Sequence, residues 1–344
     1  MNATDKMMLT VSASPHTKSA GTVTGIMLDV IIALIPAAFA GVAVFGFKAA
    51  LIIAVCVISC VFFEFISRKI MKRSSSIGDL SAVVTGLLLA FNLPVGIPVW
   101  MCVLGSLVAI VVVKQMFGGI GHNFANPAIT ARIVLLVSFA SAMTGFTSPA
   151  KNMLDAVTTA TPLAHLSAVD LSGDVAAQMN ALITNKDIPG IFNMAFGVRP
   201  GCIGEVCSVA LILGAIYLIL RGVISIAIPG SYILTVGIIM FVASDFNITF
   251  TVYELLGGGL LLGAFFMATD YSTSPINIKG KIVFGIGCGI LTAIIRLFGS
   301  LPEGVSYSIL LMNIASPLIE KMTAPKYFGF IKKKREKKVK EDVA

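Results

Sequence analysis

The sequence predicts an all-α protein that crosses a membrane many times, and its composition, apolar runs and basic residues all indicate this class. Hydrophobic residues make up 57% of the 344 residues and charged residues only 12%, with a mean hydropathy of +0.95. Soluble domains carry roughly 25% charged residues. A water-soluble fold of this length could not bury so much apolar surface, so the soluble classes are excluded.

Runs of roughly 20 apolar residues are long enough to cross the hydrocarbon core of a bilayer as helices. Ten candidates follow one another, and the third is short unless it tilts or breaks at Pro94. Their approximate bounds are 26–46, 49–66, 80–93, 98–116, 127–145, 203–220, 223–243, 252–269, 281–298 and 304–320. The residues before the first span are polar and lack the apolar core of a cleavable signal peptide.

Lys and Arg favour the cytoplasmic side of a membrane protein, and their positions predict its orientation. With the N-terminus in the cytoplasm, nineteen of the 25 Lys and Arg lie inside and five lie outside, while Arg132 falls within a span. Both termini are therefore expected in the cytoplasm of a multi-pass protein of the cell (inner) membrane. The expected parts are a cytoplasmic segment 1–25, a five-helix half 26–145, an extracytoplasmic loop 146–202, a second half 203–320 and a basic cytoplasmic tail 321–344.

Five spans on each side of the long loop predict two inverted repeats, because an odd number of spans reverses the direction of the second half. Segments 125–134 and 273–283 show a weak internal sequence similarity, since each places a proline shortly before a cation and a new span. Inverted repeats are also typical of secondary transporters, so a transporter or channel without a cofactor is the alternative function.

Few ionisable residues lie in or beside the spans, where each is costly. They are Asp29, Glu64, Asp79, Arg132, Glu205, Asp245, Glu254 and Asp270. Each is either a functional residue within the membrane or a structural one. Asp79 is compatible with a helix cap, and Asp245 and Glu254 are compatible with a short outer loop. Asp270 precedes several hydroxyl residues, an oxygen-rich cluster that suits a hard cation such as Na⁺. Asp79 and Asp270 are therefore the candidate ion-path residues.

The six cysteines and three histidines predict no metal site, because such sites need about four suitably spaced ligands. Cys202 and Cys207 are compatible with a disulfide on the outer face. Redox chemistry would then require a bound organic cofactor or partner proteins. The basic run 332–340 is typical of a solvated end near anionic lipid and does not indicate nucleic acid.

Two glycine strings interrupt the apolar pattern. Gly118 to Gly121 stand beside Asn123 and Asn126, a polar and helix-breaking cluster at membrane depth. Irregular backbone is tolerated there only where protein or a cavity satisfies it, so this cluster predicts a turn lining a site. Gly257 to Gly259 are more typical of close helix packing.

One polar segment of the long loop carries the most specific pattern, Asp155-Ala-Val-Thr-Thr-Ala-Thr161-Pro162. Alone, such small hydroxyl residues closed by a proline are typical of a turn. The segment resembles the flavinylation motif Asp-x-x-Ser/Thr-x-Ala-Thr/Ser of membrane flavoproteins in the Rnf and Na⁺-translocating NADH:quinone reductase families. Thr159 stands where those families usually have glycine. The resemblance implies FMN joined by a phosphoester bond to Thr161, with Thr158, Thr159 and Ala160 completing the motif.

Three further segments, 79–94, 118–127 and 199–205, are similar to the D subunit of the Rnf complex, and the likeness extends from about residue 20 to 320. The B subunit of the quinone reductase is related but has a longer N-terminal extension. The resemblance implies a subunit, not catalytic alone, of an ion-translocating ferredoxin:NAD⁺ oxidoreductase that relays electrons and couples them to Na⁺ or H⁺ transport. It also admits a non-covalent riboflavin.

The same resemblance implies partners and neighbours of the flavin. The partners are other Rnf-type membrane subunits, iron–sulfur subunits, a peripheral NAD-binding subunit and a flavin transferase acting on the outer side. From its position at the outer mouth, Arg199 is the cation best placed to stabilise a reduced flavin, and the alternative for it is an interfacial anchor. Gly201 and Glu205 belong to the same segment. Arg132, Asn123 and Asn126 are weaker candidates from an adjacent span.

Overall fold

The computed structural model describes residues 21–74, 76–147, 160–171, 173–197, 199–299 and 303–325. Within these ranges the regular secondary structure is helical, and an isolated bridge pairs Pro94 with Cys202. The predicted all-α class is therefore confirmed.

In the first half of the chain, side chains cap the starts of the first and fifth helices. Asn126 caps the fifth helix by accepting from the Ala128 and Ile129 amides, with Pro127 at the first helical position. The elements are α1 (Val23–Phe45), α2 (Phe47–Ile70), the 3₁₀ turn η1 (Ile77–Asp79), α3 (Ser81–Phe91), α4 (Val99–Leu107) continuing as the π-helix η2 (Val108–Gln115), α5 (Pro127–Ser138) and α6 (Ala140–Thr144).

Three short helices follow in the described part of the long loop, namely α7 (Pro162–Leu166), α8 (Val175–Thr184) and α9 (Ile191–Phe196). The second half then contains α10 (Ser208–Leu220), α11 (Ala227–Ala243), α12 (Ile248–Leu256), α13 (Leu260–Leu262) continuing as the π-helix η3 (Gly263–Met267), α14 (Ile278–Phe298) and α15 (Val305–Thr323). Gly257 to Gly259 break the chain between α12 and α13, where it bends by 62°. Every apolar span expected from the sequence coincides with a helix or a linked pair of helices.

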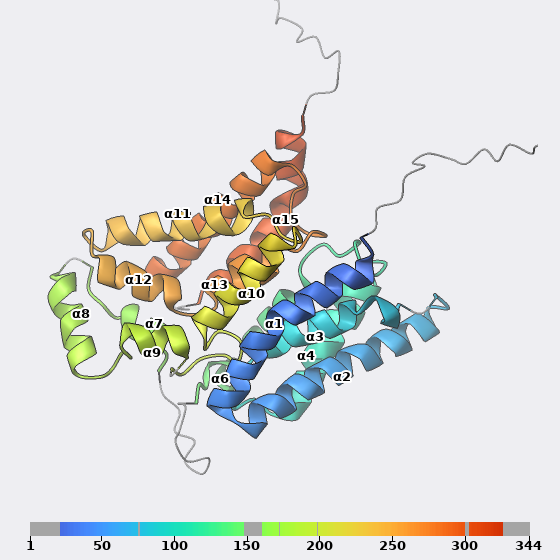
Figure 1. Ribbon diagram of the computed structural model, residues 1–344, viewed down its shortest axis with the longest axis horizontal. Helices are drawn as coiled ribbons and strands as arrows, with labels where there is room; N and C mark the ends of the chain where they lie inside the picture. Colours follow the sequence, from blue (N-terminus) through green and yellow to red (C-terminus); the bar gives the residue numbers. More distant parts are fainter. Residues whose placement is uncertain are drawn as a thin grey trace, which may run out of the picture.

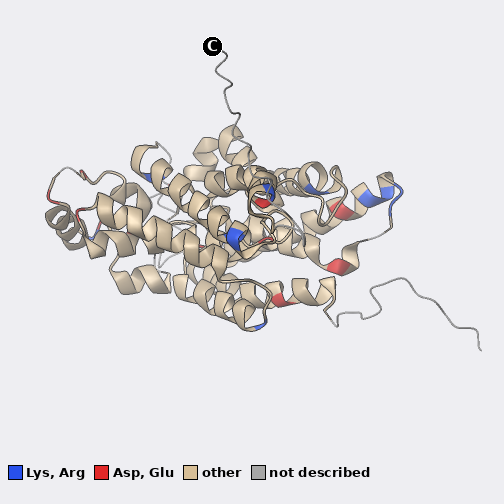
Figure 2. Ribbon diagram, turned by 90° about the horizontal axis from the view of Figure 1, so that it is seen from above, with Lys and Arg blue, Asp and Glu red and all other residues tan. Residues whose placement is uncertain are grey.

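Length and apolarity together identify the helices that suffice to cross a membrane. Within the described residues these are α1, α2 and α14, and the bent pair α12 with α13–η3 is a fourth candidate. The other apolar helices, such as α3 and α10, have between 10 and 17 residues. Long stretches of the ribbon carry no charged side chain (Figure 2), as expected for helices that face lipid.

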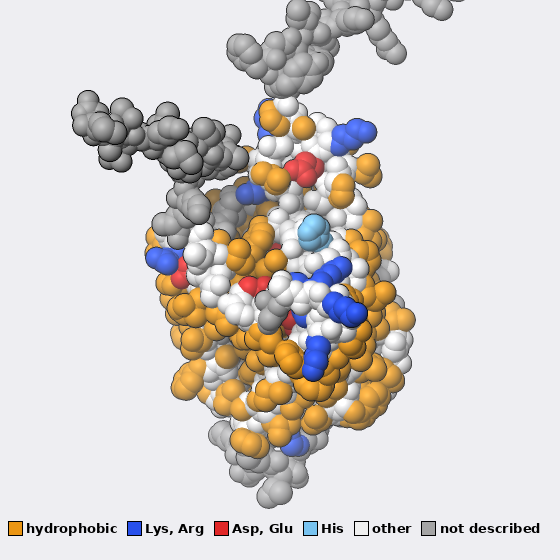
Figure 3. All heavy atoms as spheres, turned by 90° about the vertical axis from the view of Figure 1, so that its right-hand side faces the viewer, with side chains coloured by type: hydrophobic (Ala, Val, Ile, Leu, Met, Phe, Trp, Pro, Cys, Tyr) orange, Lys and Arg blue, Asp and Glu red, His pale blue; other side chains and the backbone are white. Residues whose placement is uncertain are grey.

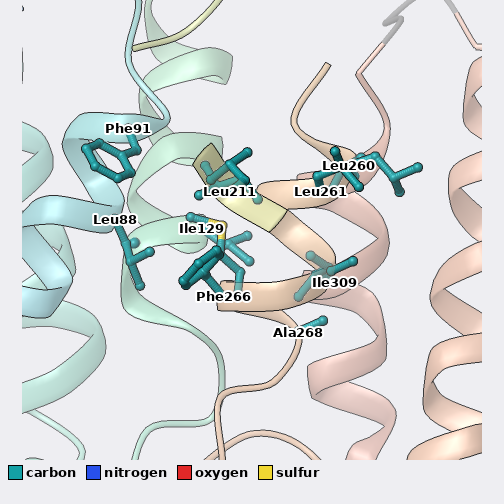
Figure 4. Packing of buried hydrophobic residues seen from close by; sticks show 14 of the residues in the cluster. Leu88, Phe91, Ile129, Leu211, Leu260, Leu261, Phe266, Ala268 and Ile309 are labelled. Carbon is teal, nitrogen blue, oxygen red and sulfur yellow. The ribbon is translucent and has the colours of Figure 1, made fainter. Parts of the chain in front are cut away.

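The core lies where the two halves meet. Helix α1 packs along α10, and α5 packs against α15. Between them, Leu88 and Phe91 of α3 face side chains of the second half (Figure 4). Phe266 of η3 and Leu211 of α10 belong to the same buried cluster. The short helix α3 and the broken segment α13–η3 are therefore the central elements of this interface.

The two ends of the molecule differ in charge. The start of α1 lies beside the turn before α3, where the Thr24 hydroxyl donates to the Gly78 carbonyl at 3.2 Å. The start of α1 and the end of α15 lie at one end of the molecule, and α6 to α9 lie toward the other (Figure 1). We call these the basic end and the loop end, because exposed basic side chains gather at the first (Figure 3). Lys69, Lys72 and Arg73 are exposed at the end of α2 or just after it.

The similar segments 125–134 and 273–283 lie at the starts of two helices. Residues 125–134 begin α5, which is followed by the short α6, whereas 273–283 begin α14, which is followed by the long α15. The shared pattern reflects a common way of starting a helix, with Pro or Asn near its first turn.

Candidate functional site

The segment 199–205 of the long loop enters the protein and pairs with the end of α3. The Ile203 amide donates to the Leu93 carbonyl at 3.2 Å, and the Gly204 amide donates to the Phe91 carbonyl at 3.0 Å. The last carbonyls of a helix have no partner within the helix. Residues 203 and 204 therefore satisfy the end of α3 inside the protein, and they bring Cys202 and Glu205 beside it.

Two arginines satisfy the end of α12 in the same way. Arg199 donates to the Leu256 carbonyl at 2.5 Å and to the Glu205 carbonyl. Arg296 of α14 donates to the Glu254 carbonyl at 2.7 Å, to the Glu254 carboxylate at 2.9 Å and to the Gly257 carbonyl at 3.3 Å. Cations at the C-terminal end of a helix also interact favourably with its dipole.

The sequence is compatible with Glu254 either as a functional ionisable residue of a span or as a residue of a short outer loop. It lies within α12 and is only 4% exposed, so the outer-loop interpretation is wrong. Asp245 is exposed in the turn between α11 and α12. The pairing of Glu254 with Arg296 was not apparent because 42 residues separate them and no local spacing marks the pair.

Thr161 lies beside the glycine break between α12 and α13, since it lines the same pocket as Gly258. It is 8% exposed and caps α7, its hydroxyl oxygen accepting from the Ala164 amide at 3.2 Å. Pro162 occupies the first position of α7 and is buried, whereas Ala160 is exposed. The other motif residues, Asp155, Thr158 and Thr159, lie outside the described residues.

Two cavities share Thr161 in their walls. The smaller one, the Arg199 pocket, is lined by Thr161, Pro162, Arg199, Glu205, Gly258 and Glu303. The larger one, the Thr161 cavity, has a volume of about 50 Å³. Its walls include Arg132, Leu136, Met143, Phe146, Ser306 and Tyr307. Thr161 thus lines both a charged pocket and a largely apolar cavity.

Arg132 connects the two halves of the chain at the wall of the Thr161 cavity. It is 4% exposed in α5, and its guanidinium donates to the Asn92 side-chain oxygen at 3.1 Å and to the Ser306 hydroxyl at 3.0 Å. It also forms an ion pair with Glu303, and its Nη2 lies 3.8 Å from the Cys202 sulfur. Its Nε is buried without a hydrogen-bond partner in the described part of the chain.

Glu205 folds back over the loop segment that carries it. Its carboxylate accepts from the Cys202 amide at 2.8 Å, and a Cβ at Gly201 would lie 2.9 Å from the same carboxylate oxygen. The ligand atoms of Cys202, Glu205 and Glu303 lie within 4.8 Å of one another, a grouping compatible with a metal ion. The sequence predicted no metal site, and Arg132 already contacts two of the three groups.

A separate cavity lies at the basic end, between the two halves. It is lined by residues of both halves, including Ser81, Lys114, Asn123, Asn126, Thr269 and Asp270. The side-chain amide of Asn126 donates to the Met267 carbonyl at 3.3 Å, and the side-chain amide of Asn123 donates to the Ser272 hydroxyl at 3.2 Å. The Asn123 side-chain oxygen is buried without a partner among the described residues. We call this space the basic-end cavity.

Asp270 and Asp79 both lie at the basic-end cavity or near it. Burial raises the pKa of Asp270, while hydrogen bonds from Ser272 and Thr273 act in the opposite direction. Asp79 accepts from the Ser81 amide at 2.8 Å and from the Ser81 hydroxyl at 2.5 Å, so it acts as a cap for α3. The Ser81 hydroxyl in turn accepts from Lys114 at 2.5 Å.

Lys114 belongs to a buried cluster that sequence reasoning missed. Its ammonium lies 2.9 Å from the Glu64 carboxylate, and both side chains are at most 3% exposed. The amide of Gln115 donates to the same carboxylate at 3.0 Å. The π-helix η2 has an extra residue per turn, which lets two consecutive residues reach one acceptor. Acid and base come from different helices, so again no local spacing marks the cluster.

The structure therefore divides the candidate residues into two groups. Thr161, Pro162, Arg199, Glu205 and Arg132 lie around the first two cavities, with Gly201 next to them. Asn123, Asn126 and Asp270 line the basic-end cavity instead, and Asp79 reaches it through Ser81. Asn126 and Arg132 lie at different depths because 1.5 Å per residue separates positions along α5.

Comparison with known proteins gives a consistent result over almost the full chain. A model of the family described as NQR2, RnfD, RnfE matches residues 10–329. The D subunit of the Na⁺-translocating ferredoxin:NAD⁺ oxidoreductase complex of Acetobacterium woodii is 46% identical over 335 residues, which cover 97% of this chain and 99% of that protein. The D subunit of the proton-translocating ferredoxin:NAD⁺ oxidoreductase complex of Clostridium ljungdahlii is 43% identical over 328 residues, covering 94% and 97%.

Proposed function

Because this chain belongs to the NQR2, RnfD, RnfE family, we propose that it is the D subunit of an ion-translocating ferredoxin:NAD⁺ oxidoreductase complex and that it carries FMN on Thr161. The observation that carries the cofactor proposal is the position of Thr161. This residue lines both a pocket with buried charges and a largely apolar cavity. A phosphate needs the first environment and a flavin ring the second.

The residues around Thr161 fit such a group. Arg132 has a buried Nε without a partner in the described chain, and a guanidinium is well suited to a phosphate. Leu136, Met143, Phe146 and Tyr307 supply apolar and aromatic surface for a ring. When bound, the flavin would accept electrons from one neighbouring cofactor and pass them to the next. The chain would hold it, exclude water and balance the negative charge of its reduced form.

Arg199 and Arg132 would have different tasks. Arg199 donates to two backbone carbonyls, so we propose that it fixes the floor of the pocket rather than the ring. Arg132 lines the Thr161 cavity and pairs with Glu303, which lines both cavities, so it is the candidate partner for the phosphate where the two cavities meet. Gly201 permits the close fold of Glu205 against the same floor.

The basic-end cavity supports two further proposals. The unpaired Asn123 oxygen and the Asn126 amide supply polar groups in a cavity formed by both halves, which suits a non-covalent riboflavin. Asp270 at its wall and Asp79 next to Ser81 would lie on the path of the transported Na⁺ or H⁺. Electron arrival would change the local charge and thereby the affinity for the cation.

We further propose ten membrane spans in two inverted halves, 26–145 and 203–320. Equivalent helices meet at the centre, as a two-fold relation requires, because α1 packs along α10 and α5 against α15. Gly86-Leu-Leu-Leu-Ala-Phe91 in α3 also resembles Gly259-Leu-Leu-Leu-Gly-Ala-Phe265 at α13, and both segments belong to the central interface.

The basic end would face the cytoplasm, by the distribution of Lys and Arg. The loop 146–202 with Thr161 would then be extracytoplasmic, within reach of an external flavin transferase, and the segments 1–25 and 321–344 would be cytoplasmic. Further partners would be the iron–sulfur, peripheral NAD-binding and other membrane subunits of such a complex.

The deciding experiment is in-gel fluorescence under ultraviolet light. The chain is produced together with a flavin transferase that attaches FMN to threonine, and it is denatured before electrophoresis. A fluorescent band at the size of this chain is expected because a covalent flavin survives denaturation. A dark band under these conditions would contradict the flavin proposal and favour a transporter, for which the broken helix α12–α13 is a suitable element.

A further inference from the structure

Glu303, two residues before the start of α15, lies where a group attached to Thr161 would need space. It lines both cavities that contain Thr161. One carboxylate oxygen pairs with Arg132, and the other is buried without a hydrogen-bond partner among the described residues. A buried charged oxygen without a partner is costly, so this carboxylate is held mainly by Arg132.

The surroundings of Glu303 are rich in negative groups and poor in free donors. The Glu205 carboxylate lies within 4.8 Å of the Glu303 carboxylate and the Cys202 sulfur. Arg199, the other buried cation of the pocket, donates to two backbone carbonyls. Arg132 is therefore the principal charge partner available here both for Glu303 and for any anion joined to Thr161.

We propose that Glu303 occupies the phosphate position on Arg132 until Thr161 is modified, and that attachment of FMN displaces the Glu303 carboxylate from Arg132. This inference rests on the proposed covalent FMN. In the attachment, the Thr161 oxygen forms a bond to the FMN phosphorus of FAD. The pyrophosphate bond of FAD breaks, AMP leaves with the bridging oxygen, and the hydroxyl proton passes to the transferase or to solvent.

The product is a phosphodiester with one negative charge, and this charge drives the exchange. Two carboxylates and a phosphodiester would otherwise share one guanidinium at short range, where like charges repel strongly. Arginine pairs with phosphate oxygens through its planar fork of donors. The Glu303 side chain is 20% exposed, so it has a route to water when it is displaced.

A double-mutant cycle tests this exchange. Native chain, Arg132→Gln, Glu303→Gln and the double variant are each produced with and without the flavin transferase, and their melting temperatures are measured in detergent. Without flavin we expect a clear coupling between the two positions, with Glu303→Gln lowering the melting temperature. With flavin attached we expect the coupling to fall to half or less, and Glu303→Gln to leave the melting temperature unchanged or raise it. Arg132→Lys replaces Arg132→Gln if the latter does not accumulate.

The buried pair of Glu254 and Arg296 provides a matched control, because it lies beside the same break in α12 but pairs without Glu303. Its coupling, measured with the two Gln variants, should be equal with and without flavin. An Arg132–Glu303 coupling that is unchanged by attached flavin, or absent from both forms, would overturn this inference alone. Absence of flavin on the native chain, checked first by mass spectrometry, would overturn the proposed function and this inference together.

Discussion

Replacing Thr161 by valine tests the attachment site with little effect on the fold. Valine keeps the shape of threonine and removes only the hydroxyl, which the phosphoester requires. The hydroxyl caps α7 through the Ala164 amide at 3.2 Å, but the same amide also donates to the Thr161 carbonyl at 2.9 Å. Loss of the cap should therefore cost about 0.5–1 kcal/mol, the low part of the range for N-caps. Such a loss lowers the melting temperature by about 2–4 °C at most.

The expected result is a folded, membrane-inserted chain without covalent flavin. Mass spectrometry of the tryptic peptide that follows Lys151 measures the attachment, and fluorescence-detected size exclusion measures the folding. Thr161→Ser is the matched control, since serine keeps both the cap and the nucleophilic oxygen and should retain the flavin. An FMN adduct in the valine variant, or one located on Thr158 or Thr159 in the native chain, would refute the assignment.

Three further predictions follow from buried and exposed charges. Arg296→Met should destabilise the chain by about 3–5 kcal/mol, because it leaves Glu254 charged and unpaired, and Arg296→Met with Glu254→Gln should recover part of that loss in a thermal melt. Burial raises the pKa of Asp270 above its ordinary value of 3.8, so the folded chain favours the protonated acid and loses stability as the pH rises through the folded pKa. Asp270→Asn should therefore gain melting temperature relative to the native chain as the pH increases above about 4, and a constant difference would contradict this. Single cysteines at the exposed positions Lys186 and Lys72, in a chain without its native cysteines, should differ in labelling by an impermeant thiol reagent on intact cells, with only position 186 reacting.

The order of the helices could be predicted well from the sequence, because apolar runs depend only on neighbouring residues. Asn126 and Pro127 are likewise identifiable as a helix start, since capping is local. The run 80–93 is too short for an untilted span, and α3 indeed ends at Phe91. The π-helices η2 and η3 carry no comparable local signal and were not predicted.

The sites are less predictable from local patterns, because their residues come from distant parts of the chain. Arg132, Asn92 and Glu303 meet only when the two halves pack together. Asn123 and Asn126 were grouped with Arg132 because they are close in sequence. Asn126 caps the start of α5 and Arg132 lies in its middle, so the helix places them at different cavities. Ion pairs such as Lys114 with Glu64 also depend on which helices become neighbours, and the apolar pattern does not determine that.

The loop segment 199–205 has a consequence for the biogenesis of this protein. It satisfies carbonyls of α3, which is synthesised before it, and Arg199 needs a carbonyl of α12, which is synthesised after it. A ribosome-bound chain that has produced only the first half therefore exposes an unfinished helix end at membrane depth. Ile203 and Gly204 can pair with the end of α3 as soon as they are made, but Arg199 gains its carbonyl partner only after Leu256 has been inserted. Burial of Arg199 is therefore completed later in assembly than the pairing of its neighbours with α3.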